Sequence, residues 1–189
     1  MPAAPVILNN TPLVAFWVLG RFDLLRDLYG EVIIPPAVHA EFLATEREDR
    51  EAALVDAPWI KTVPLAHPQR ALVYTGLDDG EAAVLALAEE LNGIVVMDER
   101  KGRRYAGRLG LPLTGSLGLL LLAKERGLLK SVDAALDQLI AAACIWTPIW
   151  LPRSCRWRAK AADPESALDA RRRWRIFRRA ALTALGLPT

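Results

Sequence analysis

Two polar residues follow short apolar segments that have the composition of buried strands. Asn9 comes directly after residues 6–8, and Asp98 comes directly after residues 94–97. In open α/β sheets, ligands bind beyond the carboxyl ends of the strands, where such side chains lie. Either residue by itself also fits a helix N-cap or a turn. The two residues therefore indicate a functional edge of a sheet only if further polar groups meet them there.

Two glutamates occupy segments whose pattern otherwise predicts buried helices. Glu41 shares a helical face with Val38, and this face is expected to pack inward. Glu81 opens the segment 81–88, which is apolar around its whole circumference and is expected to be buried. Glu81 also fits the favourable position of an acid in a first helical turn, with Asp79 as the N-cap.

We predict that four residues converge at one edge of the sheet: Asn9, Glu41, Glu81 and Asp98. Carboxylates that are crowded in one pocket repel each other, and a hard divalent cation offsets that repulsion. Oxygen ligands suit Mg²⁺ and Mn²⁺, and water held by such an ion can attack a phosphodiester. The sequence thus predicts a Mg²⁺ or Mn²⁺ site with hydrolytic chemistry.

The elements that must position these residues follow the pattern of a parallel sheet with helical crossovers. Segments rich in Val and Ile predict strands over 6–8, 32–34, 60–63, 94–97 and a short one near Leu113. Longer segments predict helices over 13–19, 22–29, 36 to about 44, 81–91, 101–109, 117–126 and 132–143. Left-handed helix ends are expected at Gly20, Gly30, Gly93, Gly110 and Gly127.

The composition favours a soluble globular protein. The 189 residues are 52% apolar and 24% charged, which is enough apolar material for a core. No apolar segment approaches the roughly 20 residues that cross a bilayer, and the N-terminus lacks the pattern of a signal peptide. We therefore expect a cytoplasmic protein without a membrane partner. Two cysteines are too few to indicate a disulfide framework.

The charge is divided unevenly along the chain. Residues 1–145 carry 14 basic and 19 acidic residues, whereas residues 146–189 carry 10 and 3, together with four of the six tryptophans. We expect a domain over 1–144 and a basic, Trp- and Arg-rich tail over 145–189. Such a tail fits an arm for RNA or a membrane surface. We prefer to interpret it as a frameshift product, because another reading frame from Cys144 can encode an ordinary amphipathic helix. The tail is then expected to be poorly ordered.

Basic residues follow Asp98 directly, in and beside the helix predicted over 101–109. They are Arg100, Lys101, Arg103, Arg104 and Arg108. Lys101, Arg104 and Arg108 share one helical face, which could hold the phosphates of a nucleic acid beside the metal. A solvated helix face is an equally good interpretation, so both stay open.

The order of these motifs resembles that of PIN domains. The motifs are VILNNTPL at 6–13, GRFDLL at 20–25, VIIPPAV at 32–38 with Glu41, LDDGEA at 77–82, VVMDERKGR at 95–103 and TGSLG at 114–118. Within the family, the chain is similar to the PIN-like subfamily of prokaryotic proteins related to VapC toxins. The resemblance covers residues 5 to about 143.

This resemblance implies a three-layer α/β/α, Rossmann-like fold and a nuclease that uses Mg²⁺ or Mn²⁺ to cut RNA. It assigns the four acidic positions of the family, in order, to Asn9, Glu41, Glu81 and Asp98. It gives Thr114 or Ser116 the task of orienting a ligand or a metal-bound water. Candidate RNA-binding residues are then Arg100, Lys101, Arg103, Arg104, Thr114 and Ser116. The implied partners are RNA, an antitoxin protein and a second copy of the chain.

One departure from the family pattern is Asn9, because active PIN nucleases have aspartate at this position. The Asn9 carbonyl oxygen can still bind a metal but supplies no negative charge, so metal affinity is expected to drop. Two functions therefore stay open: a metal-dependent endoribonuclease, which would be the toxin of a toxin–antitoxin pair, and a catalytically impaired module that binds RNA or a partner protein. A dinucleotide enzyme is a poor third, because no G-x-G-x-x-G follows the first strand.

Overall fold

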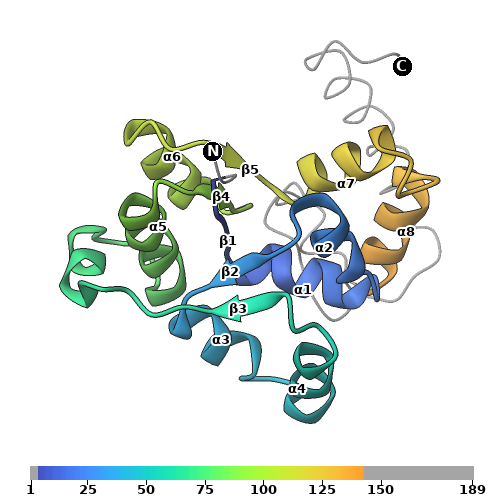
Figure 1. The fold of residues 1–189 in the computed structure, drawn as a ribbon, viewed down its shortest axis with the longest axis horizontal. Coiled ribbons are helices and arrows are strands. Elements are labelled where there is room, and N and C mark those ends of the chain that lie inside the picture. The colour runs from blue at the N-terminus through green and yellow to red at the C-terminus, as the bar shows by residue number, and fades with distance from the viewer. Residues whose placement is uncertain (1–3, 143–189) are drawn as a thin grey trace. The chain divides into compact units, whose positions relative to one another are not determined.

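The core of the molecule is a five-stranded parallel sheet with the order β3-β2-β1-β4-β5 (Figure 1). The computed structural model describes residues 4–142. The strands are β1 (Val6–Leu8), β2 (Val32–Ile34), β3 (Ile60–Thr62), β4 (Ile94–Val96) and β5 (Leu113–Thr114). Every pairing between neighbours is parallel. The predicted parallel sheet is confirmed, while the predicted boundary near residue 144 and the tail lie outside the described residues.

Helices cover both faces of the sheet. They are α1 (Asn10–Val18), α2 (Asp23–Tyr29), α3 (Pro36–Phe42), α4 (Arg47–Val55), the 3₁₀ helix η1 (Pro68–Val73), α5 (Asp79–Leu91), α6 (Arg100–Arg108), α7 (Ser116–Glu125) and α8 (Val132–Ala142). In Figure 1, α5 and α6 lie on one side of the sheet, and α1, α2 and α7 lie on the other. This is the expected three-layer α/β/α fold. No helix within residues 4–142 is long and apolar enough to cross a membrane.

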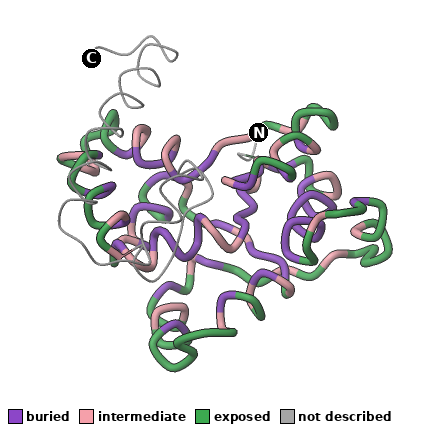
Figure 2. The backbone as a smooth tube through the Cα atoms, turned by 180° about the vertical axis from the view of Figure 1, so that it is seen from behind, coloured by how far each residue is buried: buried purple, intermediate pink, exposed green. Residues whose placement is uncertain are grey.

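The hydrophobic core runs along the strands and through α5, as the purple segments of Figure 2 show. Ile7, Leu8 and Val95 are completely buried, because helices cover both faces of these strands. Helix α5 is buried on all sides from Gly80 to Ala88. The prediction that this helix lies inside the protein is confirmed, and its first turn is thereby fixed against the sheet.

The sequence pattern did not predict α4, because this helix has no continuous apolar face. Arg50 attaches it to the rest of the fold through tertiary contacts. The Arg50 guanidinium lies over the rings of Trp17 and Phe42, at 4.7 and 5.1 Å from their centroids. Its Nη1 also donates a hydrogen bond of 2.9 Å to the carbonyl of Phe42. Such contacts leave no periodic pattern of apolar residues in the sequence.

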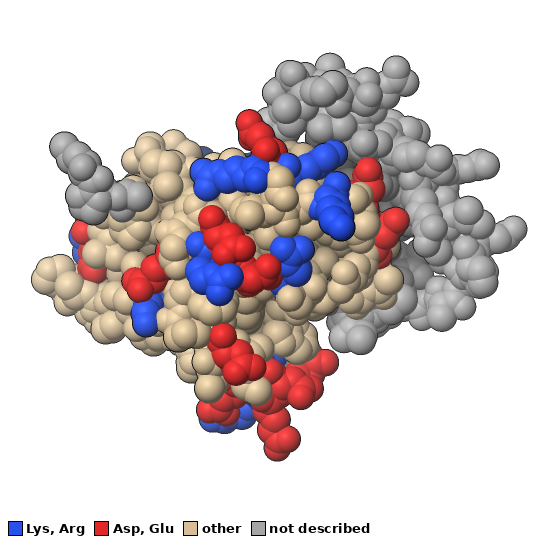
Figure 3. All heavy atoms as spheres, turned by 45° about the vertical axis from the view of Figure 1, so that its right-hand side comes forward, with Lys and Arg blue, Asp and Glu red and all other residues tan. Residues whose placement is uncertain are grey.

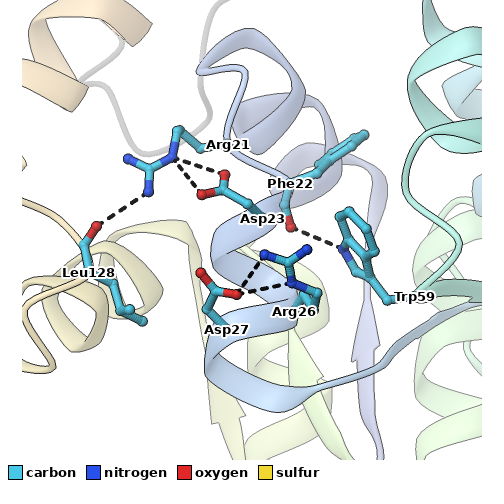
Figure 4. A network of polar contacts seen from close by, with 7 residues as sticks. All are labelled: Arg21, Phe22, Asp23, Arg26, Asp27, Trp59 and Leu128. Carbon is cyan, nitrogen blue, oxygen red and sulfur yellow. Dashed lines mark hydrogen bonds and ion pairs between the residues drawn. The ribbon is translucent and has the colours of Figure 1, made fainter.

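Polar contacts tie α2 to segments that are distant in sequence (Figure 4). Arg21 pairs with Asp23 and donates to the carbonyl of Leu128, which follows α7. The Trp59 indole donates to the carbonyl of Phe22, 3.1 Å away. These bonds fix the positions of the chain segments that lead into α2 and β3.

Four of the five glycines predicted to be left-handed have this conformation, but Gly93 does not. The φ angles of Gly20, Gly30, Gly110 and Gly127 lie between 62° and 76°. At the end of α5, Asn92 is the left-handed residue, with φ of 49°. Gly93 instead allows a close approach to the first strand: a Cβ there would meet Ile7 Cδ1 at 2.2 Å and the carbonyl oxygen of Pro5 at 2.7 Å.

We predict that Gly93→Ala lowers the free energy of unfolding by about 1–3 kcal/mol, because the methyl group would collide with backbone as well as a buried side chain. The matched control is Gly107→Ala in α6, where a Cβ would meet no atom within 4 Å. The control should be as stable as the wild type or more stable by up to about 1 kcal/mol. Urea unfolding measures both, and equal effects of the two substitutions would contradict the close approach.

Candidate functional site

The strand order reverses at β1. From β1 the chain continues to β2 and β3 on one side of the sheet, and it then returns to form β4 and β5 on the other side. Strand β1 has β2 on one side and β4 on the other, so the carboxyl ends of β1 and β4 form a topological switch point. Asn9 follows β1, and its N–H donates to the carbonyl of Val96, the last residue of β4, at 2.9 Å. Asp98 and Glu99 follow β4. The structure therefore places Asn9 and Asp98 on neighbouring strand ends.

The Asn9 side chain does not cap the helix that begins after it. Asn9 occupies the N-cap position of α1, yet its side chain makes no capping hydrogen bond. Instead Nδ2 donates to Glu99 Oε2 at 3.0 Å. Asn9 is only 3% exposed, and its Oδ1 is a buried acceptor without a hydrogen-bond partner among the described residues. A buried acceptor without a partner costs on the order of 1–3 kcal/mol, which favours a ligand-binding role for this oxygen.

Glu41 reaches the same place from α3, which packs against α5. A Cβ on Gly80, in the first turn of α5, would meet Glu41 Oε2 at 2.7 Å, Asp78 Oδ1 at 3.4 Å and Asn9 Oδ1 at 3.5 Å. We call this oxygen-lined space the Gly80 notch. The prediction that Glu41 packs inward is wrong in part, because Val38 is buried but Glu41 is exposed as a whole residue. Only its carboxyl end lies against α5.

Glu81 combines a structural and an electrostatic role. Its N–H donates to Asp78 Oδ1 at 2.7 Å, and its own carboxylate accepts from the Asp78 N–H at 3.3 Å, which completes a capping box. The N-cap is therefore Asp78, and the prediction of Asp79 is wrong by one residue. Burial, followed by repulsion from Asp78, raises the pKa of Glu81 to about 7.

Asp98 is held by the start of α7. Ser116 donates to it twice, from its backbone N–H to Oδ1 at 2.9 Å and from its hydroxyl to Oδ2. Burial raises the pKa of Asp98, while the bonds from Ser116 and the charge of Arg103 oppose that rise. Ser116 thus fixes the direction of the Asp98 carboxylate.

Glu99 is the acid to which the sequence analysis assigned no role. It is 8% exposed, and its negative charge contributes to the raised pKa of Glu41, Glu81 and Asp98. For Glu41, burial is the larger cause, and the hydrogen bond from the Asn10 side chain opposes it. The available signal was the adjacency of two acids after a predicted strand.

The basic residues beside the acids divide into two kinds. Arg103 Nη1 donates to the carbonyls of Met97 and Thr114, at 2.8 and 3.1 Å, so it links the ends of β4 and β5. Arg100, Lys101 and Arg104 are exposed on α6. The side chain of Thr114 lies under α7, because a Cβ on Gly118 would meet its Oγ1 at 2.2 Å. Lys101 Nζ donates to the carbonyl of Gly76 at 3.4 Å, so Arg100 and Arg104 are the exposed residues most available to a ligand, whereas Arg103 is committed to the fold.

The donor set suits a hard divalent cation. Within residues 4–142, no group of three or more Asp, Glu, His or Cys side chains is arranged to hold a metal ion as it stands. The unpartnered Asn9 oxygen, the Gly80 notch and three acids with raised pKa nevertheless provide oxygen ligands and an unbalanced negative charge. Binding requires Glu81 and Asp98 to share their carboxylates with their present partners or to leave them.

A family model matches most of the chain. The family model DUF3368, which describes a PIN domain, matches residues 5–153. This range covers all five strands and every residue of the candidate site. No curated protein matches the chain.

The raised pKa of Glu81 predicts a pH-dependent stability. The folded protein keeps the Glu81 proton up to about pH 7, whereas the unfolded chain loses it near the ordinary value of 4.5. The free energy of unfolding therefore falls as pH rises through this interval. Glu81→Gln keeps an acceptor for the capping box and removes the charge. We expect it to be more stable than the wild type at pH 8 by on the order of 1–2 kcal/mol, and equally stable at pH 4.

Urea unfolding at both pH values, with a chelator present, measures this difference. The control is Glu125→Gln, which removes an exposed charge from α7 and should change stability little at either pH. A Glu81→Gln effect that is the same at pH 4 and pH 8 would show that Glu81 is ionised normally.

Proposed function

The chain belongs to the PIN-domain family, whose members are typically nucleases, and from this premise we propose that it is a metal-dependent endoribonuclease. The observation that carries the proposal is the oxygen-lined Gly80 notch at the switch point, with the unpartnered Oδ1 of Asn9 facing it. PIN domains generally use divalent metals, and this donor set suits Mg²⁺ or Mn²⁺.

We assign the metal to Asn9, Glu41, Glu81 and Asp98. When bound, Mg²⁺ or Mn²⁺ neutralises phosphate charge and lowers the pKa of water for attack on the phosphodiester. The residues of this chain prepare that chemistry. Ser116 keeps the Asp98 carboxylate in place through two hydrogen bonds, and the Asn10 side chain limits the rise in the pKa of Glu41. A bound cation would favour the ionised form of these acids, whose pKa values are raised in its absence.

The RNA backbone is proposed to lie over α6, next to the acids. Arg100, Lys101 and Arg104 are exposed there and can contact phosphates, which would give binding without sequence specificity. The face in Figure 3 carries a group of basic side chains in its upper part and acids in its lower part, with both kinds mixed between them. Ser116, which holds Asp98, and Thr114, which lies beneath α7, are the weaker candidates for RNA contact.

The biological setting follows from the same proposal. A cytoplasmic ribonuclease of this kind fits the toxin of a toxin–antitoxin pair, with an antitoxin protein and a second copy of the chain as partners. These partners come from the resemblance to toxins of this family. They would be tested by co-purification and by the mass of the protein in solution.

The neutral Asn9 favours a second candidate, a PIN-fold module that binds RNA or a protein without cleaving RNA. With an amide in place of one acid, the site holds one negative charge fewer for a cation. The two functions differ in an observable way: a binding module retains RNA when chelator is added and yields no products.

We predict that the protein cleaves single-stranded RNA only with Mg²⁺ or Mn²⁺, and that Asp98→Asn abolishes cleavage together with Mn²⁺ binding. Loss of the carboxylate removes a metal ligand while the Asn amide can still accept one bond from Ser116. Gel assays follow RNA cleavage, and calorimetry follows Mn²⁺. Asp56→Asn, at the exposed end of α4, is the matched control and should behave as the wild type. A folded wild-type protein that is inert with both metals would contradict the enzyme.

A second prediction separates metal binding from stability. In Gly80→Ala the added methyl group would stand 2.7 Å from the present position of Glu41 Oε2 and displace the carboxyl end of this exposed side chain. We expect Mn²⁺ affinity to fall at least tenfold. Stability should hold or rise by up to about 1 kcal/mol, because alanine is the better helix former. Gly107→Ala supplies the matched control in calorimetry, and equal Mn²⁺ affinities in the two variants would place the metal elsewhere.

A further inference from the structure

The hydrogen bond between Asn9 and Glu99 fixes the direction of the Asn9 amide. Nδ2 lies 3.0 Å from Glu99 Oε2, and a carboxylate can only accept. Turning the amide over would bring its oxygen against a carboxylate oxygen, so the assignment of Nδ2 and Oδ1 follows from the chemistry of the partner. Oδ1 is therefore held on the side away from Glu99, where it is buried and has no partner.

Glu99 is itself held by three donors. These are the Asn9 amide, the Thr11 hydroxyl and, at 3.2 Å, the backbone N–H of Asp98. Glu99 stands at the N-cap position of α6, but its side chain makes no capping bond. The local helix thus does not explain the conformation of Glu99, whereas its contacts with the segment that follows β1 do.

Asn9 Oδ1, on the side of the amide away from Glu99, lies beside the Gly80 notch. Measured from the point where a Gly80 Cβ would stand, Asn9 Oδ1 is 3.5 Å away and Glu41 Oε2 is 2.7 Å away. The amide oxygen of Asn9, which follows β1, and the carboxylate of Glu41, on α3, thus both lie close to one point at the first turn of α5. The nitrogen of the same amide donates a hydrogen bond to the Glu99 carboxylate.

We propose that Glu99 is a positioning residue, which directs Asn9 Oδ1 into the Gly80 notch as a metal ligand and supplies beside it the negative charge that Asn9 lacks. The inference rests on the proposed metal-dependent function. If Glu99 has this role, the amide and the acid can be exchanged between the two positions. An amide at position 9 with an acid at position 99 has the same total charge as an acid at position 9 with an amide at position 99. Either pair is joined by one N–H···O bond, with donor and acceptor exchanged.

The test is a double-mutant cycle with two readouts: the Kd for Mn²⁺ from calorimetry, and the Tm in chelator. Glu99→Gln should weaken Mn²⁺ binding at least tenfold, because the charge is lost and the amide is no longer held in one direction. Asn9→Asp should lower the Tm in chelator, because two carboxylates then face each other. The double substitution should bind Mn²⁺ at least fivefold more tightly than Glu99→Gln and should melt above Asn9→Asp. If Glu99 only supported the fold, the double substitution would restore neither Mn²⁺ affinity nor the Tm.

The matched control is Glu90→Gln, which also removes a carboxylate that accepts two hydrogen bonds, here from the backbone of Ala66 and His67. Glu90 lies nine residues beyond Glu81 on α5, roughly 13 Å along the helix, and its loss should leave the Kd unchanged. A Kd for Glu99→Gln equal to that of the wild type, or a double variant no better than the single ones, would overturn this inference alone. A wild-type protein that binds no Mn²⁺ would overturn it together with the proposed function.

Discussion

Repulsion among carboxylates at the carboxyl ends of β1 and β4 is the constraint around which the candidate site is built. Burial raises the pKa of Glu41, Glu81 and Asp98, and the nearby charge of Glu99 raises each further. A fold that collects acids in this way loses stability on ionisation unless donors or cations compensate them. Three of these acids accordingly accept at least one hydrogen bond: Glu99 from Asn9, Glu81 from the Asp78 N–H, and Asp98 from Ser116.

The donors come largely from two short segments that follow strands. After β1, Asn9 and Thr11 hold Glu99, while the Asn10 side chain limits the rise in the pKa of Glu41. After β5, Ser116 holds Asp98. These segments are positioned by the parallel sheet, whose strands are buried by helices on both faces. The packing of the core thus determines where the donors lie, and the donors determine where the acids point.

Asn9 connects these donor contacts to the proposed chemistry. Its amide nitrogen satisfies one acid, and its amide oxygen is left buried without a partner. An aspartate at this position would add charge to the cluster but could not donate to Glu99. The neutral residue is therefore consistent with a site whose charge lies on the neighbouring acid, and it does not by itself indicate an inactive nuclease.

Most elements, and the edge of the sheet at which chemistry is expected, follow from the residue pattern alone. Short Val- and Ile-rich segments identified the central strands β1, β2 and β4, because strands covered on both faces must be apolar, while the edge strands β3 and β5 contain fewer apolar residues and are partly exposed. The order of Asn9, Glu41, Glu81 and Asp98 with their flanking motifs identified the family. Helix α4 was missed, because Arg50 holds it through contacts with Trp17 and Phe42 that leave no periodic pattern.

The roles of the individual acids depend on contacts between segments that are distant in sequence. Glu99 shares its position after a strand with Asp98, so the sequence could not show which of them accepts from Asn9 and which from Ser116. Nor could it show that Gly80 leaves room for the Glu41 carboxyl group, or that Gly93 lies against the first strand. The physical reason is the same in each case. Hydrogen-bond direction and close approach depend on atoms brought together from distant parts of the chain, whereas periodicity and composition report only on local structure and burial.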